Sequence, residues 1–550
     1  MSATASQSAT ASQSADALFK AGLKAEAAQQ YVEALFKFSA SLQYGANQAL
    51  TWCKIGMLYL RMARYVQAAE NLEFALKLEP NNTQATYGLA IAYFYLGRLD
   101  ESCVLIDQAT LAQPDNSTYA LDRANIYSIH NPDPLLKLEL YRDWGQRFAD
   151  PLAAKSKPFD NDFRADKKLR IGYVSGDMRE HAVAFFMEPV FANHNAKRVE
   201  VFVFSTSKQK DAITQRLKKL VPNWFDVSQQ NDDALFNLIR KKRIDVLVDL
   251  SGHTQGHRLF VFARRAAPVQ VTWLGYMGGT LGMQAMDYRL TDLNMDPAGN
   301  EQFFVEKLFR LRCMASYLPP ANTPLATEPP MLGTGRPTLI SLNSSKKITD
   351  EMLLTWRRIL ELRPEAQLFI HVQENSAEDA IATMEPRLVK MEFPLDRIIL
   401  SPRVSLKEFM ESGNLADIAL DTSPISGGTT TLHTLWMGLP IVALRGHDAV
   451  SSSTAANLEV YGLGEWVAEN AEGYIRNVLN LIDNPQILID HRATIRNKMM
   501  ANELMRYDER CLELERAYQM MWINHLKGYH QYLISQSHNA EARALLKEYA

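Results

Sequence analysis

The sequence has few cysteines, no long apolar run and almost no excess charge. Its four cysteines, Cys53, Cys103, Cys313 and Cys511, lie far apart and show no CxxC spacing, so neither a disulfide framework nor a zinc site is indicated. No apolar stretch approaches the length of a membrane span, and the first residues lack the apolar core of a signal peptide. We therefore expect no membrane association and a reducing, cytoplasmic location.

The charge balance also gives no indication of a nucleic-acid partner. The formal net charge is -3 and the isoelectric point is about 6.5, and the longest basic cluster, residues 240–243, is short enough to be a solvated helix end. We therefore set nucleic-acid binding aside. With 550 residues, 47% of them hydrophobic, the chain is expected to form three or four globular domains.

Two different patterns occupy the first quarter of the chain. Residues 1–14 repeat small polar side chains and predict a disordered leader. From Ala15 a period of 34 residues begins. Its best copy, residues 49–82, carries the tetratricopeptide pattern at Trp52, Ile55, Gly56, Tyr59, Ala68, Leu72, Ala75 and Pro80. We expect tetratricopeptide repeats over residues 15–130, which either recruit a protein segment or brace the domains after them.

Alternating strands and helices fill most of the remaining chain. Strand patterns at 169–175, 199–204, 244–250 and 269–274, and again at 338–342, 367–372, 397–400, 418–420 and 441–444, are separated by helix-length segments. The predicted fold class is an α/β pair of Rossmann-like domains preceded by all-α repeats, with a ligand cleft at the carboxyl ends of the strands. The expected divisions are a connector at 131–168, the first Rossmann-like domain at 169–322, a linker at 323–337, the second Rossmann-like domain at 338–500 and a helical tail at 501–550.

The stretch from Asp421 to Pro440 is the strongest candidate for binding chemistry. It follows the apolar run 418–420 and contains Gly427, Gly428, Thr429 and Thr430 immediately before a helical pattern. Unpaired N–H groups and partial positive charge at a helix start can hold a phosphate, and glycines let an anion approach the backbone. By itself the segment fits an ordinary strand-to-helix turn equally well.

Other polar residues follow predicted strands. His181 comes after strand 169–175 and is either a general base or a helix-start residue satisfied by local hydrogen bonds. Asp249 and His253 suggest either a metal site or a polar loop lining the acceptor side of the cleft, and we favour the loop. A Gly-rich turn that contains Tyr276, Gly278 and Thr280 is expected to shape the same side.

A lysine follows the first strand of the second Rossmann-like domain. Asn343 and Lys347 come directly after strand 338–342. Together with the turn at 427–430, Lys347 would place fixed donors around a nucleotide diphosphate. A surface lysine is the simpler interpretation of this residue alone.

Ordered motifs along the chain resemble one enzyme family. The matching segments are 169–177 with His181, 267–276, 286–288, 415–417, 420–422, 427–430, 435–440 and 514–516. In this order and spacing they are similar to the protein O-linked N-acetylglucosamine transferases and their bacterial and plant SPINDLY-like relatives, which combine tetratricopeptide repeats with a GT-B glycosyltransferase.

The resemblance implies an inverting transfer of a sugar from a nucleotide diphosphate to a protein side chain, without a metal or other cofactor. His181 matches the family's active-site histidine, Lys347 the lysine that holds the diphosphate, and Thr429 and Thr430 the donors at the phosphate-binding helix start. His433 stands where the family usually has an aspartate for the donor ribose, and Phe409 lies near the position at which family members often have a base-stacking histidine.

These departures leave the donor open. N-acetylglucosamine from UDP is the default, with UDP-glucose or a GDP-sugar as alternatives. The expected activity is transfer to Ser or Thr. The alternatives are an asparagine N-glucosyltransferase and a non-catalytic tetratricopeptide adaptor with a decayed transferase domain. The expected partners are a nucleotide sugar and acceptor proteins recruited by the repeats, and homo-oligomer formation is open.

Overall fold

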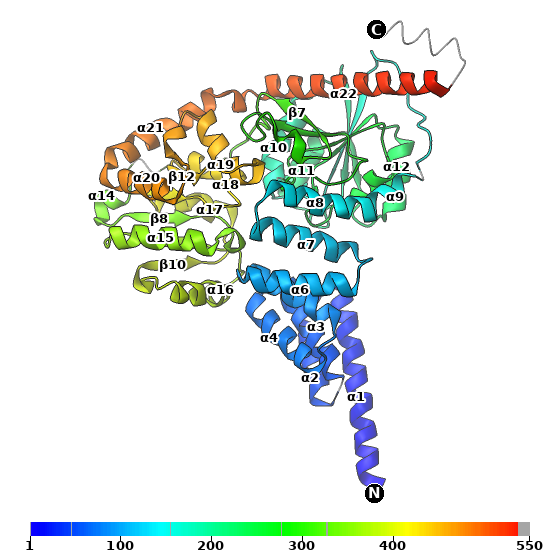
Figure 1. Ribbon diagram of the computed structural model, residues 1–550, viewed down its shortest axis with the longest axis vertical. Coiled ribbons are helices and arrows are strands. Elements are labelled where there is room, and N and C mark those ends of the chain that lie inside the picture. Colours follow the sequence, from blue (N-terminus) through cyan, green and yellow to red (C-terminus); the bar gives the residue numbers. More distant parts are fainter. Residues whose placement is uncertain (1, 46, 155, 277, 326–327, 537–550) are drawn as a thin grey trace.

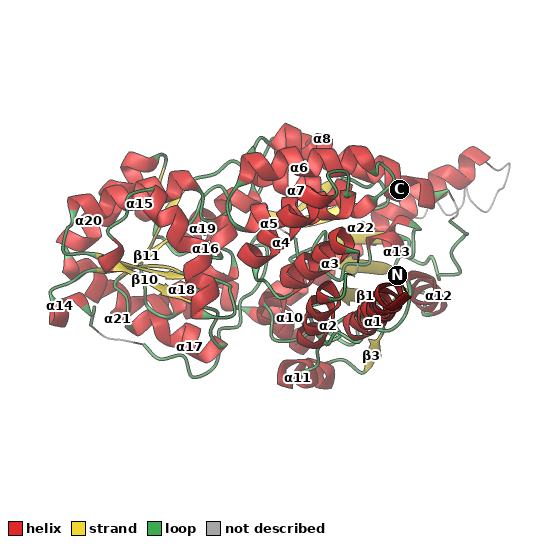
Figure 2. Ribbon diagram, turned by 90° about the horizontal axis from the view of Figure 1, so that it is seen from below, coloured by secondary structure: helices red, strands yellow, loops and turns green. Residues whose placement is uncertain are grey.

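The computed structural model describes residues 2–45, 47–154, 156–276, 278–325 and 328–536. An N-terminal stack of helices leads to two parallel sheets, each with helices on both sides (Figure 1, Figure 2). Residue 1 of the predicted leader, residues 326–327 of the predicted linker and residues 537–550 of the predicted tail lie outside the described residues. Among the described helices, none has the length and apolarity needed to cross a bilayer.

The helical stack consists of hairpins that follow the sequence period. Its elements are α1 Ser2–Ala27, α2 Tyr31–Gln43, α3 Gln48–Arg61, α4 Tyr65–Leu78, α5 Thr83–Tyr95, α6 Leu99–Ala112, α7 Ser117–His130, α8 Pro134–Trp144, the π-helix η1 Gly145–Ala149 and α9 Asp150–Ala153. Asn47, Asn82 and Asn116 cap α3, α5 and α7, each accepting a hydrogen bond from a backbone N–H of the helix that it precedes. Gly56 lets α3 approach α4 closely, because an added Cβ would lie 2.5 Å from Leu72 Cγ. The 34-residue period is therefore the period of these hairpins.

The prediction of a disordered leader over residues 1–14 was wrong for the part that the structure describes. Helix α1 extends back to Ser2. The leader is made of Ser, Ala, Thr and Gln, and no Gly or Pro interrupts residues 2–21. Ala and Gln have good helix propensity, and the helix propagates from the packed part of α1 without a breaker.

The segment 131–168, predicted as a connector, begins with helix α8, which forms a further hairpin with α7. Helix α8 pairs with α7, so the stack continues beyond residue 130. Tyr141 and Trp144 of α8 are buried in the core of the first sheet. Figure 1 shows α6, α7 and α8 as successive layers that lead to that sheet. The weak periodicity of this segment arises because α8 buries one face against the repeats and another against the sheet.

The first sheet has seven parallel strands in the order β3-β2-β1-β4-β5-β6-β7. Its strands are β1 Leu169–Ser175, β2 Val199–Ser205, β3 Asn223–Asp226, β4 Val246–Asp249, β5 Val269–Thr272, β6 Tyr288–Asp292 and β7 Lys307–Leu311. The helices between them are α10 Ala182–Asn193, α11 Ala212–Leu220, α12 Asp232–Lys241, α13 Leu259–Ala263 and the 3-10 helix η2 Asn300–Phe303. We call this domain the first lobe.

The second sheet has six strands in the order β10-β9-β8-β11-β12-β13. Its strands are β8 Thr338–Ser341, β9 Gln367–His371, β10 Ile398–Ser401, β11 Ile418–Leu420, β12 Ile441–Leu444 and β13 Val467–Ala468. The helices around it are α14 Met331–Thr334, α15 Asp350–Leu362, α16 Ala377–Lys390, α17 Leu406–Glu411, α18 Thr429–Trp436, α19 Ala449–Val460, α20 Ala471–Asp483, α21 Pro485–Ala501 and the short 3-10 helices η3 Ser345–Lys347, η4 Leu395–Arg397, η5 Ser412–Asn414, η6 Gly464–Trp466 and η7 Glu503–Met505. We call this domain the second lobe.

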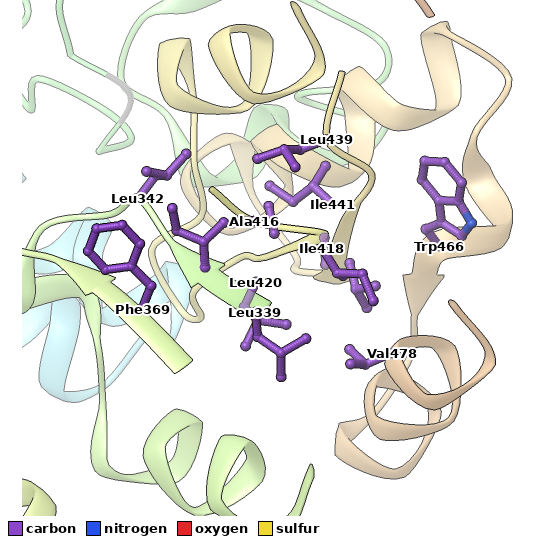
Figure 3. Close-up of a cluster of buried hydrophobic side chains, with 14 of the residues drawn as sticks. Leu339, Leu342, Phe369, Ala416, Ile418, Leu420, Leu439, Ile441, Trp466 and Val478 are labelled. Atoms are coloured by element: carbon purple, nitrogen blue, oxygen red, sulfur yellow. The ribbon is translucent and has the colours of Figure 1, made fainter. Parts of the chain in front are cut away.

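The core of the second lobe lies between its central strands and the covering helices. Figure 3 shows Leu339, Ile418 and Ile441 of adjacent strands close to Val478 of α20. All four side chains are buried, and each contributes about 1.5–3 kcal/mol by leaving water. This packing fixes the strand ends from which the polar loops of the second lobe emerge.

Both sheets have the strand order of a doubly wound fold, as predicted for two Rossmann-like domains. The order reverses between β1 and β4 in the first lobe and between β8 and β11 in the second. Loops at these points lead in opposite directions and leave a crevice at the carboxyl ends of the strands. His181 follows β1, Lys347 follows β8, and the 421–428 turn follows β11.

The long C-terminal helix α22 Tyr507–Gln536 returns from the second lobe to the first. It crosses the top of the molecule in Figure 1 and packs on the first sheet. Leu514, Tyr518 and Trp522 are buried there, and the Trp522 indole N–H donates to the carbonyl of Arg164 at 3.1 Å. The amphipathic tail is thus part of the first lobe's core.

Candidate active site

The junction between β11 and α18 is built around the carboxylate of Asp421. Its Oδ1 accepts one hydrogen bond from the backbone N–H of Gly427 at 2.8 Å and another from the amide of Asn343 at 3.1 Å. The side chain is buried, and burial raises the pKa of its carboxyl group to about 6. Asp421 therefore folds the 421–427 turn back on itself and ties it to the loop after β8.

Gly427 leaves no room for a side chain. An added Cβ would lie 2.4 Å from the hydroxyl oxygen of Thr431 and 3.1 Å from that of Thr454. These two hydroxyls are 2.7 Å apart, and the Thr454 hydroxyl also donates to the Gly427 carbonyl at 3.2 Å. Thr454 belongs to α19, so this helix supports the turn from outside.

The first turn of α18 borders a cavity between the lobes. The N-cap residue is Gly428, which has no side chain to accept from the first N–H groups. Gly428 and Thr429 line the cavity, and Thr430 is half-buried beside them. A helix start with free N–H groups and partial positive charge is suited to a phosphate.

Lys347 reaches the same turn from the end of β8. Its Nζ donates to the carbonyl oxygen of Ser426 at 2.9 Å. Burial lowers the pKa of Lys347 to about 8, and the nearby Asp421 carboxylate opposes that shift. Two loops from neighbouring strands therefore bring an ammonium group and a helix N-terminus together.

The cavity spans about 620 Å³, part of which is open to solvent. Among its lining residues are Phe186, Leu274, Asp292, Asn294 and Met295 from the first lobe and Gly428, Thr429, Leu432, Ser453 and Asn457 from the second. A crevice at the carboxyl ends of parallel strands is the usual ligand site of such folds. The cavity is therefore the candidate active site.

His433 lies one turn into α18 and is buried. Its Nδ1 is 2.6 Å from the hydroxyl of Tyr317, and its ring packs edge-on against Phe185 at a centroid distance of 4.8 Å. Burial lowers the pKa of His433 to about 3, so the ring is neutral near pH 7. Tyr317 occupies Nδ1, which leaves Nε2 as the ring nitrogen for a ligand.

Phe409 of α17 stands beside this histidine. The centroid of its half-buried ring is 6.1 Å from that of His433 and 6.0 Å from that of His371. The structure thus brings Phe409 and His433 together as one aromatic surface in the second lobe. Such a surface can stack against a flat ring.

His181 is the N-cap residue of α10. Its Nδ1 accepts from the backbone N–H of Val183 at 3.3 Å, and its Nε2 lies 3.7 Å from Asp177 Oδ1. The side chain is 37% exposed, and burial lowers its pKa while Asp177 opposes the shift. Phe186 of the same helix lines the cavity. His181 therefore caps α10 and also keeps an accessible imidazole ring.

Asp249 and His253 were predicted to line the acceptor side of the cleft, and the structure corrects this. The Asp249 carboxylate accepts from the N–H groups of Ser251 at 3.1 Å and Gly252 at 2.8 Å, and burial raises its pKa to about 6. The His253 ring stacks on Tyr141 of α8 at 5.1 Å, and burial lowers its pKa to about 3. Both residues are buried, Asp249 at the end of β4 beneath its own loop and His253 against Tyr141 and Trp144 of α8.

The Gly-rich turn after β5 is likewise folded against its surroundings. The Thr280 hydroxyl is buried and donates to Glu306 at 2.6 Å, which also corrects its predicted place in the cleft. The Tyr276 hydroxyl donates to that of Tyr141 at 2.5 Å. Gly278 covers the Tyr276 ring so closely that an added Cβ would lie 2.2 Å from it. Tyr276 and Gly278 remain half-buried.

One group within the described part of the chain has the composition of a metal site, namely His194, Cys511 and Glu515. The Nδ1 of His194 lies 3.1 Å from Glu515 Oε1 and 3.4 Å from the Cys511 sulfur. Glu515 also accepts from the N–H of Asn195 at 2.7 Å and pairs with Arg198 at 3.0 Å. These contacts join α22 to the end of α10, and we interpret the group as a structural junction.

Several residues that line the cavity were missed in the sequence. Asp292 ends β6 and Asn294 follows it, and this short strand was not identified by the apolar pattern. Ser453 and Asn457 lie on α19, whose sequence lacks a clear apolar stripe. Leu274 was expected as the last residue of the strand 269–274, although it has a left-handed backbone with φ of 61° at the cavity wall.

Known proteins share this architecture. The profile of glycosyl transferase family 41 matches residues 152–316 and 338–514, and a tetratricopeptide repeat profile matches residues 59–126. A mutant of the Thermobaculum terrenum O-GlcNAc transferase superposes with a TM-score of 0.84 at 31% identity, covering 94% of this chain and 99% of that one.

Plant proteins are similar over the same region. One from Arabidopsis thaliana, named as a probable UDP-N-acetylglucosamine–peptide N-acetylglucosaminyltransferase SPINDLY, is 32% identical over 396 residues, which are 71% of this chain and 43% of the relative. One of the same name from Oryza sativa subsp. japonica is 32% identical over 435 residues, or 78% of this chain and 46% of the relative. This chain thus spans less than half the length of these plant relatives. The family profile covers both lobes, and the chain belongs to glycosyl transferase family 41.

Proposed function

We propose that the chain is a protein glycosyltransferase that moves a sugar from a nucleoside diphosphate to a protein hydroxyl group. The observation that carries the proposal is the meeting of Lys347 with the 426–431 turn at the interlobe cavity. A diphosphate placed there would face an ammonium group and a helix N-terminus. The names of the similar proteins, which include O-GlcNAc transferase, support the same reaction class.

The proposed chemistry is a single displacement with inversion. A Ser or Thr hydroxyl oxygen attacks the anomeric carbon from the face opposite the diphosphate. The bond from that carbon to the phosphate oxygen breaks, and the hydroxyl proton passes to solvent or a nearby base. Charge that develops on the leaving diphosphate is met by Lys347 and the N–H groups of α18, which are fixed before the reaction starts. We therefore propose that catalysis needs no metal ion.

His181 is proposed to act on the acceptor. Its ring is accessible, and α10, which it caps, reaches the cavity through Phe186. A neutral imidazole can orient a hydroxyl group or take its proton. Tyr276 and Gly278 are half-buried and retain a proposed place near the acceptor, whereas Asp249, His253 and Thr280 support the loops beneath.

N-acetylglucosamine is the proposed default sugar, in keeping with the names of the relatives. The nucleoside is proposed to lie against Phe409 and His433, with Asn343 supporting the phosphate turn. His433 offers one ring nitrogen where a carboxylate would offer two oxygens. UDP-glucose and GDP-sugars are therefore the alternatives to test.

Incubation of the purified chain with UDP-N-acetylglucosamine, UDP-glucose or GDP-sugars tests the proposal. The intact masses of candidate acceptor proteins are then measured by mass spectrometry, and a parallel series of reactions contains EDTA. We expect a mass gain of one sugar residue with one donor, unaffected by EDTA. Mapping of the modified residue separates Ser or Thr from Asn, which would indicate an N-glucosyltransferase. If no donor is hydrolysed and no donor gives a mass gain, the result supports the non-catalytic adaptor alternative.

A further inference from the structure

A buried ion pair connects the helical stack to the second lobe next to the candidate site. The Nζ of Lys137 on α8 donates to Asp448 Oδ2 at 2.6 Å. Only 7% of the lysine side chain and 10% of the aspartate side chain are exposed. Helix α8 is itself fixed to the first lobe through buried Tyr141 and Trp144. The pair therefore crosses from one lobe to the other.

Asp448 is also the N-cap residue of α19. Its other oxygen, Oδ1, accepts from the backbone N–H of Ser451 at 2.9 Å, and the two residues form a capping box. The Lys137 ammonium opposes the effect of burial and keeps the pKa of Asp448 below its usual value. One carboxylate thus binds the start of α19 with one oxygen and α8 with the other.

The first turn of α19 holds the residue to which Lys347 is bonded. The N–H and the hydroxyl of Ser426 both donate to the carbonyl of Val450, at 3.1 and 2.8 Å. One turn later, the Thr454 N–H donates to the Ser426 hydroxyl at 3.3 Å. The Ser426 carbonyl accepts from Lys347. An unbroken path of contacts therefore leads from Lys137 to the lysine of the candidate site.

The other side of the turn also touches the helical stack. Ile425 packs against the apolar cluster of α5, α6 and α7 that includes Phe94 and Ile126. Lys346, the neighbour of Lys347, places its ammonium 5.4 Å from the ring centroid of Tyr95 on α5. The stack thus contacts both loops that meet at the phosphate turn.

We propose that Lys137 is a positioning residue for donor binding: its ion pair with Asp448 fixes the start of α19 and, through α19, the 426–431 turn. This inference rests on the proposed use of that turn for a diphosphate. A buried ion pair adds little stability over an apolar pair of the same shape, but it holds two elements in one relative position. In this protein the element held is the support of the donor turn.

Three variants and a control test the inference in the full chain. Lys137→Met keeps the side-chain length without charge, and Asp448→Asn keeps the capping oxygen. The third variant combines both changes. Arg64→Met is the control, because Arg64 also joins the stack to the second lobe, through Asp379 at 3.2 Å, but leads to α16 and not to α19. UDP and GDP binding are measured by calorimetry, and folding is followed by thermal unfolding.

We expect Lys137→Met to weaken binding of the preferred nucleotide about tenfold, within the range typical of coupled sites. The double variant should lose less than the product of the single losses, because it leaves no unpaired buried charge. Arg64→Met should bind within about twofold of the wild type, since its contact bypasses α19.

The outcomes separate this inference from the proposed function. A wild type that binds neither UDP nor GDP argues against the function. A wild type that binds, together with a Lys137→Met variant that melts earlier but binds unchanged, overturns the positioning role. If Lys137→Met does not fold, Asp448→Asn decides in the same way, because its cap remains intact.

Discussion

The ammonium nitrogen of Lys347 lies 2.9 Å from the carbonyl oxygen of Ser426, which joins a loop after β8 to a loop after β11. The hydrogen bond holds a positive charge beside the first turn of α18 before any ligand arrives. A diphosphate would then replace one carbonyl acceptor with charged oxygens. The lysine charge and the residues around the turn can each be altered separately.

Replacement of Lys347 by Met should remove the charge but keep most of the side-chain volume. We expect turnover to fall by about 10²–10³, the usual loss when one preorganised donor to a developing charge is removed. Nucleotide binding should also weaken, which calorimetry measures. Lys346→Met is the matched control, because Lys346 faces Tyr95 of the helical stack. Equal losses in the two variants would contradict a specific role for Lys347.

The pH dependence of donor binding should show the titration of Lys347. Burial lowers its pKa to about 8, so the free protein loses this charge as the pH rises through that value. We expect donor affinity and kcat/KM to decrease above about pH 8, because the charged form binds the diphosphate. The decrease should be absent from the residual activity of Lys347→Met. If donor affinity of the wild type does not change between pH 7 and 9, the charge of Lys347 does not contribute to donor binding.

The free energy of unfolding should also depend on the titration of Lys347, but it should increase with pH where donor affinity decreases. Between about pH 8 and the unfolded value of 10.5 the unfolded chain binds more protons at Lys347 than the folded chain does. The contribution of this lysine to the free energy of unfolding therefore increases as the pH rises through this range. Denaturant unfolding of the wild type and Lys347→Met at pH 7 and 9.5 measures it. The free energy of unfolding of the wild type, relative to that of Lys347→Met, should be larger at pH 9.5 than at pH 7.

Most strand ends that carry the site were predictable from sequence because their strands are largely buried and mostly apolar. The strands at 169–175 and 418–420 agree with β1 and β11 residue for residue. Their following loops, with His181 and Gly427, begin where these strands end, so their places after the strands could be read from the sequence. The edge strand β3 was not predicted: its residues Asn223–Asp226 are only partly buried and include polar side chains.

Burial by distant segments was not predictable. Asp249, at the end of β4, and His253, in the loop after it, look like cleft residues, but both are buried. The His253 ring stacks on Tyr141 of α8, more than 100 residues earlier. The ion pair of Lys137 with Asp448 spans a still larger separation of 311 residues. No local pattern of a single sequence encodes such contacts. They depend on how the helical stack docks on the two lobes.

His181 should affect turnover more than donor binding. His181→Ala removes both the imidazole and the cap, whereas His181→Asn removes the imidazole but keeps a good N-cap. We expect both variants to lower kcat to a similar extent with donor affinity within a few-fold. Only His181→Ala should also lose about 1 kcal/mol of stability. Full activity of His181→Asn would show that capping is the residue's whole role.

Glu515 should contribute to the stability of the fold and not to donor binding. Its carboxylate is buried with His194, Asn195 and Arg198 around it. Glu515→Ala leaves these groups without their acceptor, and we expect a loss of about 3–5 kcal/mol in the free energy of unfolding. Glu509→Ala on the exposed face of α22 should cost at most about 1 kcal/mol. Urea unfolding measures both, and similar losses would contradict the junction role of α22.

His433 should determine how the donor nucleoside is held. In His433→Asp the Tyr317 hydroxyl can still donate to one carboxylate oxygen, and the other oxygen becomes free for a ribose hydroxyl. We expect affinity for UDP to rise about tenfold, since a hydrogen bond to a charged group contributes about 1.5–3 kcal/mol. His433→Asn has the same shape without the charge and should gain less.

The two variants also decide where the ribose lies. A carboxylate buried against Phe185 and Phe409 has a raised pKa, so the gain in His433→Asp should disappear as the pH falls and the acid becomes protonated. Calorimetric titrations with UDP at pH 5 and 8 measure this difference. Identical affinities of the Asp and Asn variants at both values would place the ribose elsewhere, because a charge in contact with its hydroxyls has to change their binding.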